Sequence, residues 1–234
     1  MIRLLQIDAS ARPGRAGIDP HGSHTRRLTH HFIDRWLQDR PGDIVVRRDV
    51  GAEPPRPVSG DWIHAAFTPE PQREAWMGTC LAESDALTAE LIAADVIVVG
   101  TPMYNFGMPA ALKAWLDNVV RIGLTFGFDP ARGDDPYIRL LAERPRHVVV
   151  LSSRGGHGME PGGPLAHMNH LEPHLRTAFG FIGLDHVESI AVEHEEEGGE
   201  RLAASLAAAL TRVEQTVARL QRTAAEEAMP LVSA

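Results

Sequence analysis

Hydroxyl-bearing side chains stand near the start of the chain in a pattern that suits phosphate binding. Ser10 follows a short apolar run, and Ser23, His24 and Thr25 precede an amphipathic segment. Serine before a helix is a common N-cap, and the first backbone N–H groups of a helix attract anions. Hydroxyls and N–H groups together can hold a phosphate without a lysine. Serine-rich caps also occur in helices that bind nothing, so this segment alone leaves both interpretations open.

A second loop, at residues 100–109, combines apolar and aromatic side chains between two prolines. Its central residues are Met103, Tyr104, Asn105 and Phe106. Such a loop would set backbone amides and apolar side chains against a flat ring. The alternative is a buried turn that Met103 and Phe106 fill.

A third loop, after residue 151, is rich in glycine. Its residues include Ser153, Arg154, Gly155 and Gly156. Because glycine has no Cβ, the backbone at these positions can approach a ligand closely.

The segments around these loops alternate between short β-branched runs and helical patterns. We expect strands at residues 2–7, 44–50, 96–99, 148–151 and 187–192. We expect helices at residues 25–37, 84–94, 109–123, 171–182 and 200–227. This alternation predicts an α/β fold with a doubly wound, five-stranded parallel sheet and helices on both faces. Each loop then follows a strand, at the sheet edge where open α/β folds bind ligands.

The whole chain, residues 1–234, is expected to form a single domain with two additions. A proline-rich insertion at about residues 51–83 interrupts the alternation, and is either functional or an ordered packing arm. The C-terminal helix, at about 200–227, has apolar residues at helical spacing, namely Leu202, Leu206, Leu210, Val213, Val217 and Leu220. Part of this stripe must cover the sheet, and its length favours a dimer.

Composition excludes several classes of protein. The formal net charge is −8 and no block of basic residues occurs, so no nucleic-acid partner is expected. Cys80 is the only cysteine, which fits a reducing compartment. The apolar runs are too short for a membrane span or a signal peptide, so we expect a cytoplasmic protein with no membrane partner. The glycine signatures of P-loop and dinucleotide-binding Rossmann proteins are missing.

Metal binding is an alternative interpretation of the histidines. His167, His170 and His174 are three and four residues apart, close to one face if that region is helical. Pro173 and the glycines of the preceding loop weaken this geometry. Solvent-exposed histidines are the simpler interpretation, and no metal site is expected.

Several motifs resemble one enzyme family. Met103-Tyr104-Asn105-Phe106 and Ser153-Arg154-Gly155-Gly156, with residues 113–117, 121–126 and 179–184, are similar to motifs of the FMN-dependent NADH-azoreductases. These enzymes are also called NADH:quinone oxidoreductases. The resemblance extends from Met1 to about residue 210. It implies a flavodoxin-like fold, FMN at the carboxyl ends of the strands, and active sites at a homodimer interface.

The resemblance also implies roles for individual residues. Ser10, Ser23, His24 and Thr25 would hold the FMN phosphate. Residues 103–106 would border the isoalloxazine, residues 153–156 would contact its pyrimidine side, and the region of Phe126 and Phe128 would line the pocket mouth. The loop between Ser10 and Ser23 is longer than is usual in the family, and residues 157–170 are richer in Gly, Pro and His, which affects acceptor specificity most.

The implied activity is that of an FMN-dependent NAD(P)H oxidoreductase. NADH or NADPH would be the electron donor, and a quinone or an azo compound the acceptor, by ping-pong hydride transfer through FMN. This chemistry requires no catalytic acid, base or nucleophile from a side chain. The alternative is a flavodoxin-type electron carrier, which binds FMN without turning over small molecules.

Overall fold

The computed structural model describes residues 1–227, so residues 228–234 of the expected domain lie outside the described part. Its centre is a five-stranded sheet in the order β2-β1-β3-β6-β7. The strands are β1 (Arg3–Asp8), β2 (Ile44–Asp49), β3 (Val96–Pro102), β6 (His147–Ser153) and β7 (His186–Val192). All four pairings are parallel. The predicted fold class, a doubly wound flavodoxin-like sheet, is confirmed.

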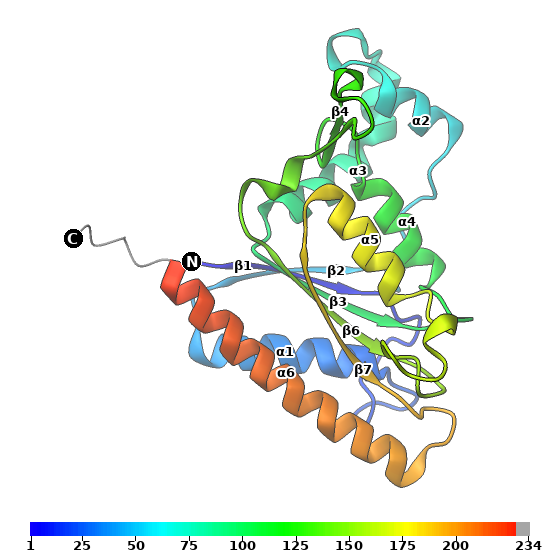
Figure 1. The fold of residues 1–234 in the computed structure, drawn as a ribbon, viewed down its shortest axis with the longest axis vertical. Helices are drawn as coiled ribbons and strands as arrows, with labels where there is room; N and C mark the ends of the chain where they lie inside the picture. The colour runs from blue at the N-terminus through cyan, green and yellow to red at the C-terminus, as the bar shows by residue number, and fades with distance from the viewer. Residues whose placement is uncertain (228–234) are drawn as a thin grey trace, which may run out of the picture.

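Helices cover both faces of the sheet (Figure 1). Helices α1 (His24–Asp39) and α6 (Gly199–Glu227) lie on one face, and α3 (Ala75–Ala93), α4 (Ala110–Val119) and α5 (Glu172–Ile182) lie on the other. Alternate strand residues point to opposite faces. Leu4 and Val98 therefore join the core under α1 and α6, whereas Leu5 and Val99 join the core under α3, α4 and α5.

The proline-rich insertion contains more helix than its sequence indicates. It forms α2 (Gly60–Phe67) and a 3-10 turn at Glu70–Gln72, after which α3 begins at Ala75. The helix start expected at residue 84 was therefore wrong. The reason is tertiary, because Met77 and Leu81 of α3 are buried together with Ala65 and Ala66 of α2 in a small separate core.

A two-stranded antiparallel hairpin, β4 (Phe126–Phe128) and β5 (Tyr137–Arg139), lies outside the main sheet, and its Phe126 and Tyr137 contact Phe181 of α5. The helix expected to reach residue 123 ends at Val119. The hydroxyl of Thr125 donates to the carbonyl of Val119 at 2.7 Å and accepts from the Arg121 N–H at 2.8 Å. These local bonds turn the chain into the hairpin. Three further 3-10 turns lie at Pro130–Arg132, Leu140–Glu143 and Ala166–Met168.

The apolar stripe of α6 is used within the chain. Val213, Val217 and Leu220 are buried against α1 and the sheet, and Leu202, Leu206 and Leu210 pack partly buried against the same core. The stripe therefore covers the sheet as expected, but it offers little apolar surface to a second chain. No helix in the described residues is long and apolar enough to cross a membrane.

Candidate functional site

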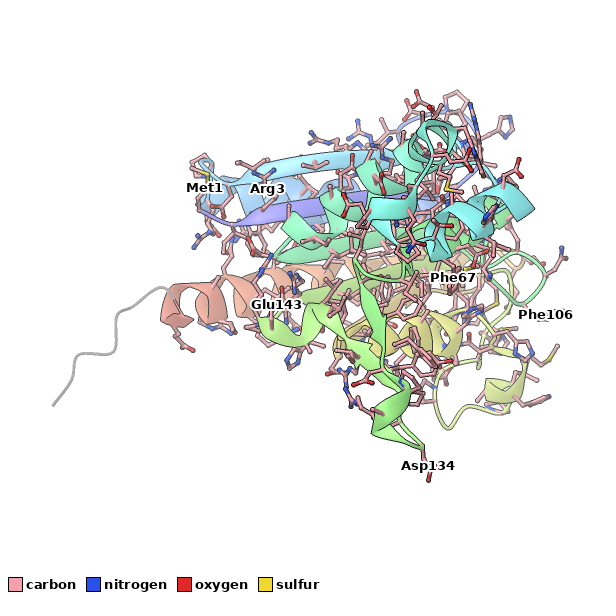
Figure 2. All side chains as sticks on the ribbon, turned by 90° about the horizontal axis from the view of Figure 1, so that it is seen from above. Met1, Arg3, Phe67, Phe106, Asp134 and Glu143 are labelled. Atoms are coloured by element: carbon pink, nitrogen blue, oxygen red, sulfur yellow. The ribbon has the colours of Figure 1, made fainter. Side chains whose placement is uncertain are left out.

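The loops that follow β1, β3 and β6 meet at one edge of the sheet. Figure 2 shows Phe106 at the end of the molecule opposite Met1 and Arg3, where the strands begin. The loops are joined directly, because the Ala9 N–H donates to the Gly100 carbonyl at 2.8 Å and the Met103 N–H donates to the Ser153 carbonyl at 2.8 Å. The Ala11 N–H also reaches the Tyr104 hydroxyl at 3.4 Å. The three loops therefore behave as one structural unit.

A small cavity of about 60 Å³ opens where these loops meet. Most of the residues expected from the sequence line it, namely Ser10, Ser23, His24, Met103, Tyr104, Ser153, Arg154 and Gly155. Within residues 1–227, Thr25, Asn105, Phe106 and Gly156 lie nearby in the chain but do not line it. The cavity thus brings together groups from all three loops.

The lining also contains residues that the sequence interpretation missed, Arg12, Pro102 and Glu195. Arg12 and Pro102 belong to the loops already singled out, so position alone could have indicated them. Glu195 comes from the loop between β7 and α6. It lies in an acidic run, and such a run in a sequence usually indicates a solvent-exposed loop. Only the packing of that loop brings it to the cavity.

The N-terminus of α1 forms one wall of the cavity. Ser23 is its N-cap, and its hydroxyl accepts the Arg26 N–H at 3.3 Å. The Thr25 hydroxyl lies 2.9 Å from the Ser23 hydroxyl and is fully buried behind it. Since first-turn N–H groups have no acceptor within a helix, this wall offers donors to an anion.

His24 has an unsatisfied ring nitrogen beside the cavity. Burial lowers the pKa of His24 below 6.5, the nearby Glu195 carboxylate opposes that effect, and Arg27 and Arg12 add to it. The Nε2 atom lies 4.0 Å from a Glu195 oxygen. The Nδ1 atom is buried and has no hydrogen-bond partner among the described residues. The described residues therefore leave the hydrogen-bonding capacity of this atom unused.

The loop after β3 is held in a strained turn. The N–H groups of Tyr104 and Gly107 each donate to the other residue's carbonyl, at 2.9 and 3.0 Å. The two residues between them, Asn105 and Phe106, have positive φ angles of 47° and 70°. A bulky residue such as phenylalanine rarely adopts this conformation, and such strain often marks a functional segment. The turn leaves the side chains of Tyr104 and Phe106 41% and 44% exposed at the sheet edge.

Arg154 follows β6 and is only 5% exposed. Its Nη2 donates to Glu172 Oε1 at 3.0 Å, and the Ser152 hydroxyl donates to the same oxygen at 2.7 Å. Its Nε and Nη1 atoms are buried without a hydrogen-bond partner in the part of the chain described, although Nε lies 3.8 Å from the carboxylate of Glu193. Burying a polar group without a hydrogen bond costs free energy, so this arginine is an unusual group in the cavity wall.

The glycine-rich loop after β6 packs against the loop between β7 and α6. The Glu195 and Glu196 N–H groups donate to the carbonyls of Arg154 and Gly155 at 3.3 and 3.2 Å. A Cβ on Gly155 would lie 2.5 Å from the carboxylate of Glu196. The space at Gly155 is therefore taken by the β7–α6 loop.

Other residues singled out from the sequence lie elsewhere. His167 is in a 3-10 turn, His170 in a loop and His174 in α5, so they do not share one helix face. Phe126 contacts Tyr137 and Phe181, and Phe128 contacts Tyr137, in an aromatic cluster on the hairpin. In a single chain this cluster is not part of the cavity lining at residues 1–227.

Comparisons with known proteins agree with this architecture. A family model described as the flavodoxin-like fold matches residues 3–217. The FMN-dependent NADH:quinone oxidoreductase 2 of Colwellia psychrerythraea is 41% identical over 220 residues, which is 94% of this chain and 100% of that protein. The FMN-dependent NAD(P)H:quinone oxidoreductase 1 of Pseudomonas aeruginosa is 44% identical, over 85% of this chain and 90% of that protein.

Among solved structures, an FMN-dependent NADH-azoreductase of Bacillus anthracis in complex with FMN has a TM-score of 0.78 and 17% identity, over 93% of this chain and 99% of that one. At this identity the likeness supports the fold alone. From the family match and the curated relatives together, we conclude that the chain belongs to the flavodoxin-like fold family, as a homologue of the FMN-dependent NADH:quinone oxidoreductases.

Proposed function

We propose that the protein is an FMN-dependent NAD(P)H oxidoreductase that reduces quinones or azo compounds. One observation carries the proposal, which is the cavity where three strand-end loops meet, lined by the expected residues. The relatives at 41% and 44% identity are named for this activity, which supports assigning it to the chain.

The residues present fit the chemistry of FMN. A phosphate needs several donors, and Ser10, Ser23, Arg12 and the first turn of α1 offer them around one space. A polar ring edge needs a polar, largely dry setting, which Ser153, Arg154 and Gly155 of the cavity lining offer. A flat ring needs an apolar face, which Met103, Tyr104 and Phe106 offer.

When bound, FMN would supply the hydride chemistry between NAD(P)H and the acceptor. The residues of this chain would bind FMN and orient it. The α1 wall would hold the phosphate, and residues 103–106 would border the ring system. Residues 153–156 would contact the pyrimidine side, where the backbone N–H groups of Gly155 and Gly156 would stabilise negative charge. No side-chain acid or base has to act.

We also propose that the protein is a homodimer in which two chains form each site. The strand-end cavity measures about 60 Å³, far below the roughly 300–1,000 Å³ that is typical of small-molecule pockets. Tyr104 and Phe106 stand beside it, 41% and 44% exposed. These observations support a site of which one chain supplies only one wall, completed by a second copy.

We also propose a cytoplasmic location and a single domain. A cytoplasmic location agrees with a nicotinamide donor and with the single cysteine, and cell fractionation would test it. A single domain agrees with two core clusters that share the strands of one sheet. One cooperative unfolding transition followed by two probes would test that.

The decisive experiment follows the absorption spectrum of the purified protein, with and without added FMN, in the absence of oxygen. We expect bound FMN to bleach on addition of NADH or NADPH, without any other protein. Benzoquinone or an azo dye should then restore the oxidised spectrum catalytically, with parallel double-reciprocal plots. Flavin that binds but stays oxidised would contradict the enzyme and favour an electron carrier.

A further inference from the structure

Two histidines and a glutamate converge beside the loop that follows β6. His157 Nδ1 and His194 Nδ1 lie 3.2 and 2.8 Å from the same oxygen, Oε1 of Glu197. The two imidazole rings are stacked, with centroids 4.4 Å apart and planes inclined by 24°. One ligand atom from each residue lies within 4.8 Å of the other two. We propose that His157, His194 and Glu197 form a binding site for a divalent transition-metal ion such as Zn²⁺.

The donor set determines which class of ion fits. Imidazole nitrogens favour Zn²⁺, Ni²⁺ and Cu²⁺, whereas Mg²⁺ and Ca²⁺ prefer a shell of oxygens. Bonds of about 2.0–2.1 Å in a tetrahedral Zn²⁺ site place ligand atoms about 3.3 Å apart. The two histidine Nδ1 atoms lie 3.2 and 2.8 Å from Glu197 Oε1, close to this value, and rotation of the stacked rings would turn both nitrogens toward one ion. The His157 side chain is 54% exposed, so it has room to rotate and solvent can supply the remaining ligand.

The backbone of His194 adopts a conformation that is unusual for a histidine. Its φ angle is +66°, a left-handed conformation that glycine adopts without cost and other residues adopt with strain. Its N–H donates to the Gly156 carbonyl at 3.2 Å, and its own carbonyl accepts the Gly198 N–H at 2.9 Å. A histidine at this position costs backbone strain and brings its ring against His157 and Glu197.

The charges around the cluster also suit a cation. Arg201 binds the other oxygen of Glu197, Oε2, at 2.8 Å, which leaves Oε1 turned toward the histidines. Glu195 and Glu196, next to Glu197 in the loop, add negative charge that offsets Arg201.

The site joins two segments that the fold brings together. His157 continues the loop of residues 153–156, whereas His194 and Glu197 belong to the β7–α6 loop that packs on it. An ion held by all three residues would fix these loops to each other. As a consequence that rests on the proposed function, the ion should tighten FMN binding, because residues 153–156 border the proposed ring site.

Cobalt provides the direct test, because four- or five-coordinate Co²⁺ absorbs visible light far more strongly than the hydrated ion. Co²⁺ added to the untagged protein should produce visible bands that equimolar Zn²⁺ removes and excess Mg²⁺ does not. Zn²⁺, but not Mg²⁺, should raise the melting temperature. A wild-type protein without such bands would overturn the proposal.

Variants assign the bands to these residues. His194→Gly removes the imidazole and relieves the left-handed strain, so the variant should fold at least as well and lose the bands. Loss of an outer-shell partner alone weakens metal sites about 10- to 100-fold, so loss of a ligand in His157→Gln should weaken Co²⁺ binding at least about tenfold. His167→Gln, which removes an exposed histidine outside the cluster, is the control and should match the wild type. Bands retained in His194→Gly, or lost in His167→Gln, would overturn the assignment.

The coupling to FMN is measured separately, as the FMN dissociation constant with and without Zn²⁺ in wild type and His194→Gly. Tighter binding with Zn²⁺ in the wild type alone supports the coupling. An unchanged constant overturns the coupling, while the Co²⁺ spectrum still decides the metal site and flavin binding itself still decides the proposed function.

Discussion

Arg26 of α1 and Asp49 of β2 form a two-bond ion pair, with Nη1–Oδ2 at 2.6 Å and Nη2–Oδ1 at 2.8 Å. The same guanidinium donates to the carbonyls of Ser10 at 2.8 Å and Arg12 at 2.7 Å. Arg26 is only 5% exposed. It therefore holds, from behind, the backbone of the loop that carries the proposed phosphate ligands.

Replacing Arg26 with methionine should destabilise the fold. Breaking a fully buried ion pair costs about 3–5 kcal/mol, and the Asp49 side chain is 41% exposed, so we expect a loss of about 2 kcal/mol. Urea denaturation measures it. Arg35→Met, which removes a partly exposed pair with Asp39 on the same helix, is the control and should cost less than about 0.5 kcal/mol. Equal losses in both variants would contradict the role given to Arg26.

The Ser23 hydroxyl should matter for FMN but not for riboflavin, which has no phosphate. Ser23→Gly removes the hydroxyl and keeps most of the capping preference, so the fold should lose only a few tenths of a kcal/mol. Hydrogen bonds to charged groups contribute about 1.5–3 kcal/mol, so FMN affinity should fall about tenfold to one-hundredfold. Titration calorimetry with both ligands measures this.

Thr25→Val serves as the comparison for Ser23→Gly, because the Thr25 hydroxyl contacts Ser23 and does not line the cavity in the described structure. We expect Thr25→Val to weaken FMN binding less than Ser23→Gly does. An equal loss of FMN and riboflavin affinity in Ser23→Gly would place the phosphate elsewhere.

His24 should take up a proton when FMN binds. Burial lowers its pKa below 6.5, so the unfolded chain holds more protons in the window between that lowered value and 6.5. The stability linked to His24 is therefore present above pH 6.5 and is lost as the pH falls through this window. A bound phosphate would favour the charged imidazole and raise its pKa again.

Calorimetry at pH 6.5 in buffers of different ionisation enthalpy counts the protons taken up. The titration of the phosphate itself is common to wild type and His24→Gln, so the difference between them reports His24. We expect the wild type to take up more protons with FMN, and no difference with riboflavin. Identical proton counts for FMN in both proteins would show that His24 does not face the phosphate.

The Phe106 ring should contribute to FMN affinity rather than to folding. Phe106→Gly relieves a strained φ of 70°, which offsets the entropic cost of about 0.5–1 kcal/mol for glycine, so stability should change by less than about 1 kcal/mol. Aromatic stacking contributes about 0.5–1.5 kcal/mol, so FMN should bind about two- to tenfold more weakly. Asn105→Gly relieves the neighbouring strain and keeps the aromatic ring, so its FMN affinity should fall less than that of Phe106→Gly. A loss in Asn105→Gly as large as that in Phe106→Gly would point to turn geometry instead of the ring.

The proposed dimer should be required for tight FMN binding. Light scattering at working concentration should give twice the chain mass, and dilution to the monomer should release FMN, because a single chain encloses only about 60 Å³ at the site. Mass and flavin fluorescence can be followed in one dilution series. A monomer that keeps its FMN would contradict the shared site.

The sequence by itself determined the sheet and the edge of the sheet that carries the candidate site. Continuous apolar runs such as Val96–Val99 and Val148–Leu151 are local signals of buried parallel strands, and the loops after them were visible as runs of Ser, Gly, Pro and aromatic residues. Parallel strands place their carboxyl ends together, so Ser10, Met103 and Ser153 were expected to be neighbours. The cavity lining agrees with that expectation.

Only the tertiary structure determined where α3 begins and which loops contact each other, because both depend on packing between segments that are distant in the sequence. Helix α3 begins at Ala75 because Met77 and Leu81 are buried beside α2, and no local pattern records that contact. Glu195 reaches the cavity, and His194 meets His157, because the β7–α6 loop folds back onto Arg154, Gly155 and Gly156 through backbone hydrogen bonds. Those bonds join main-chain atoms, which are the same in every residue type. The side chains in the sequence therefore do not indicate which loops contact each other.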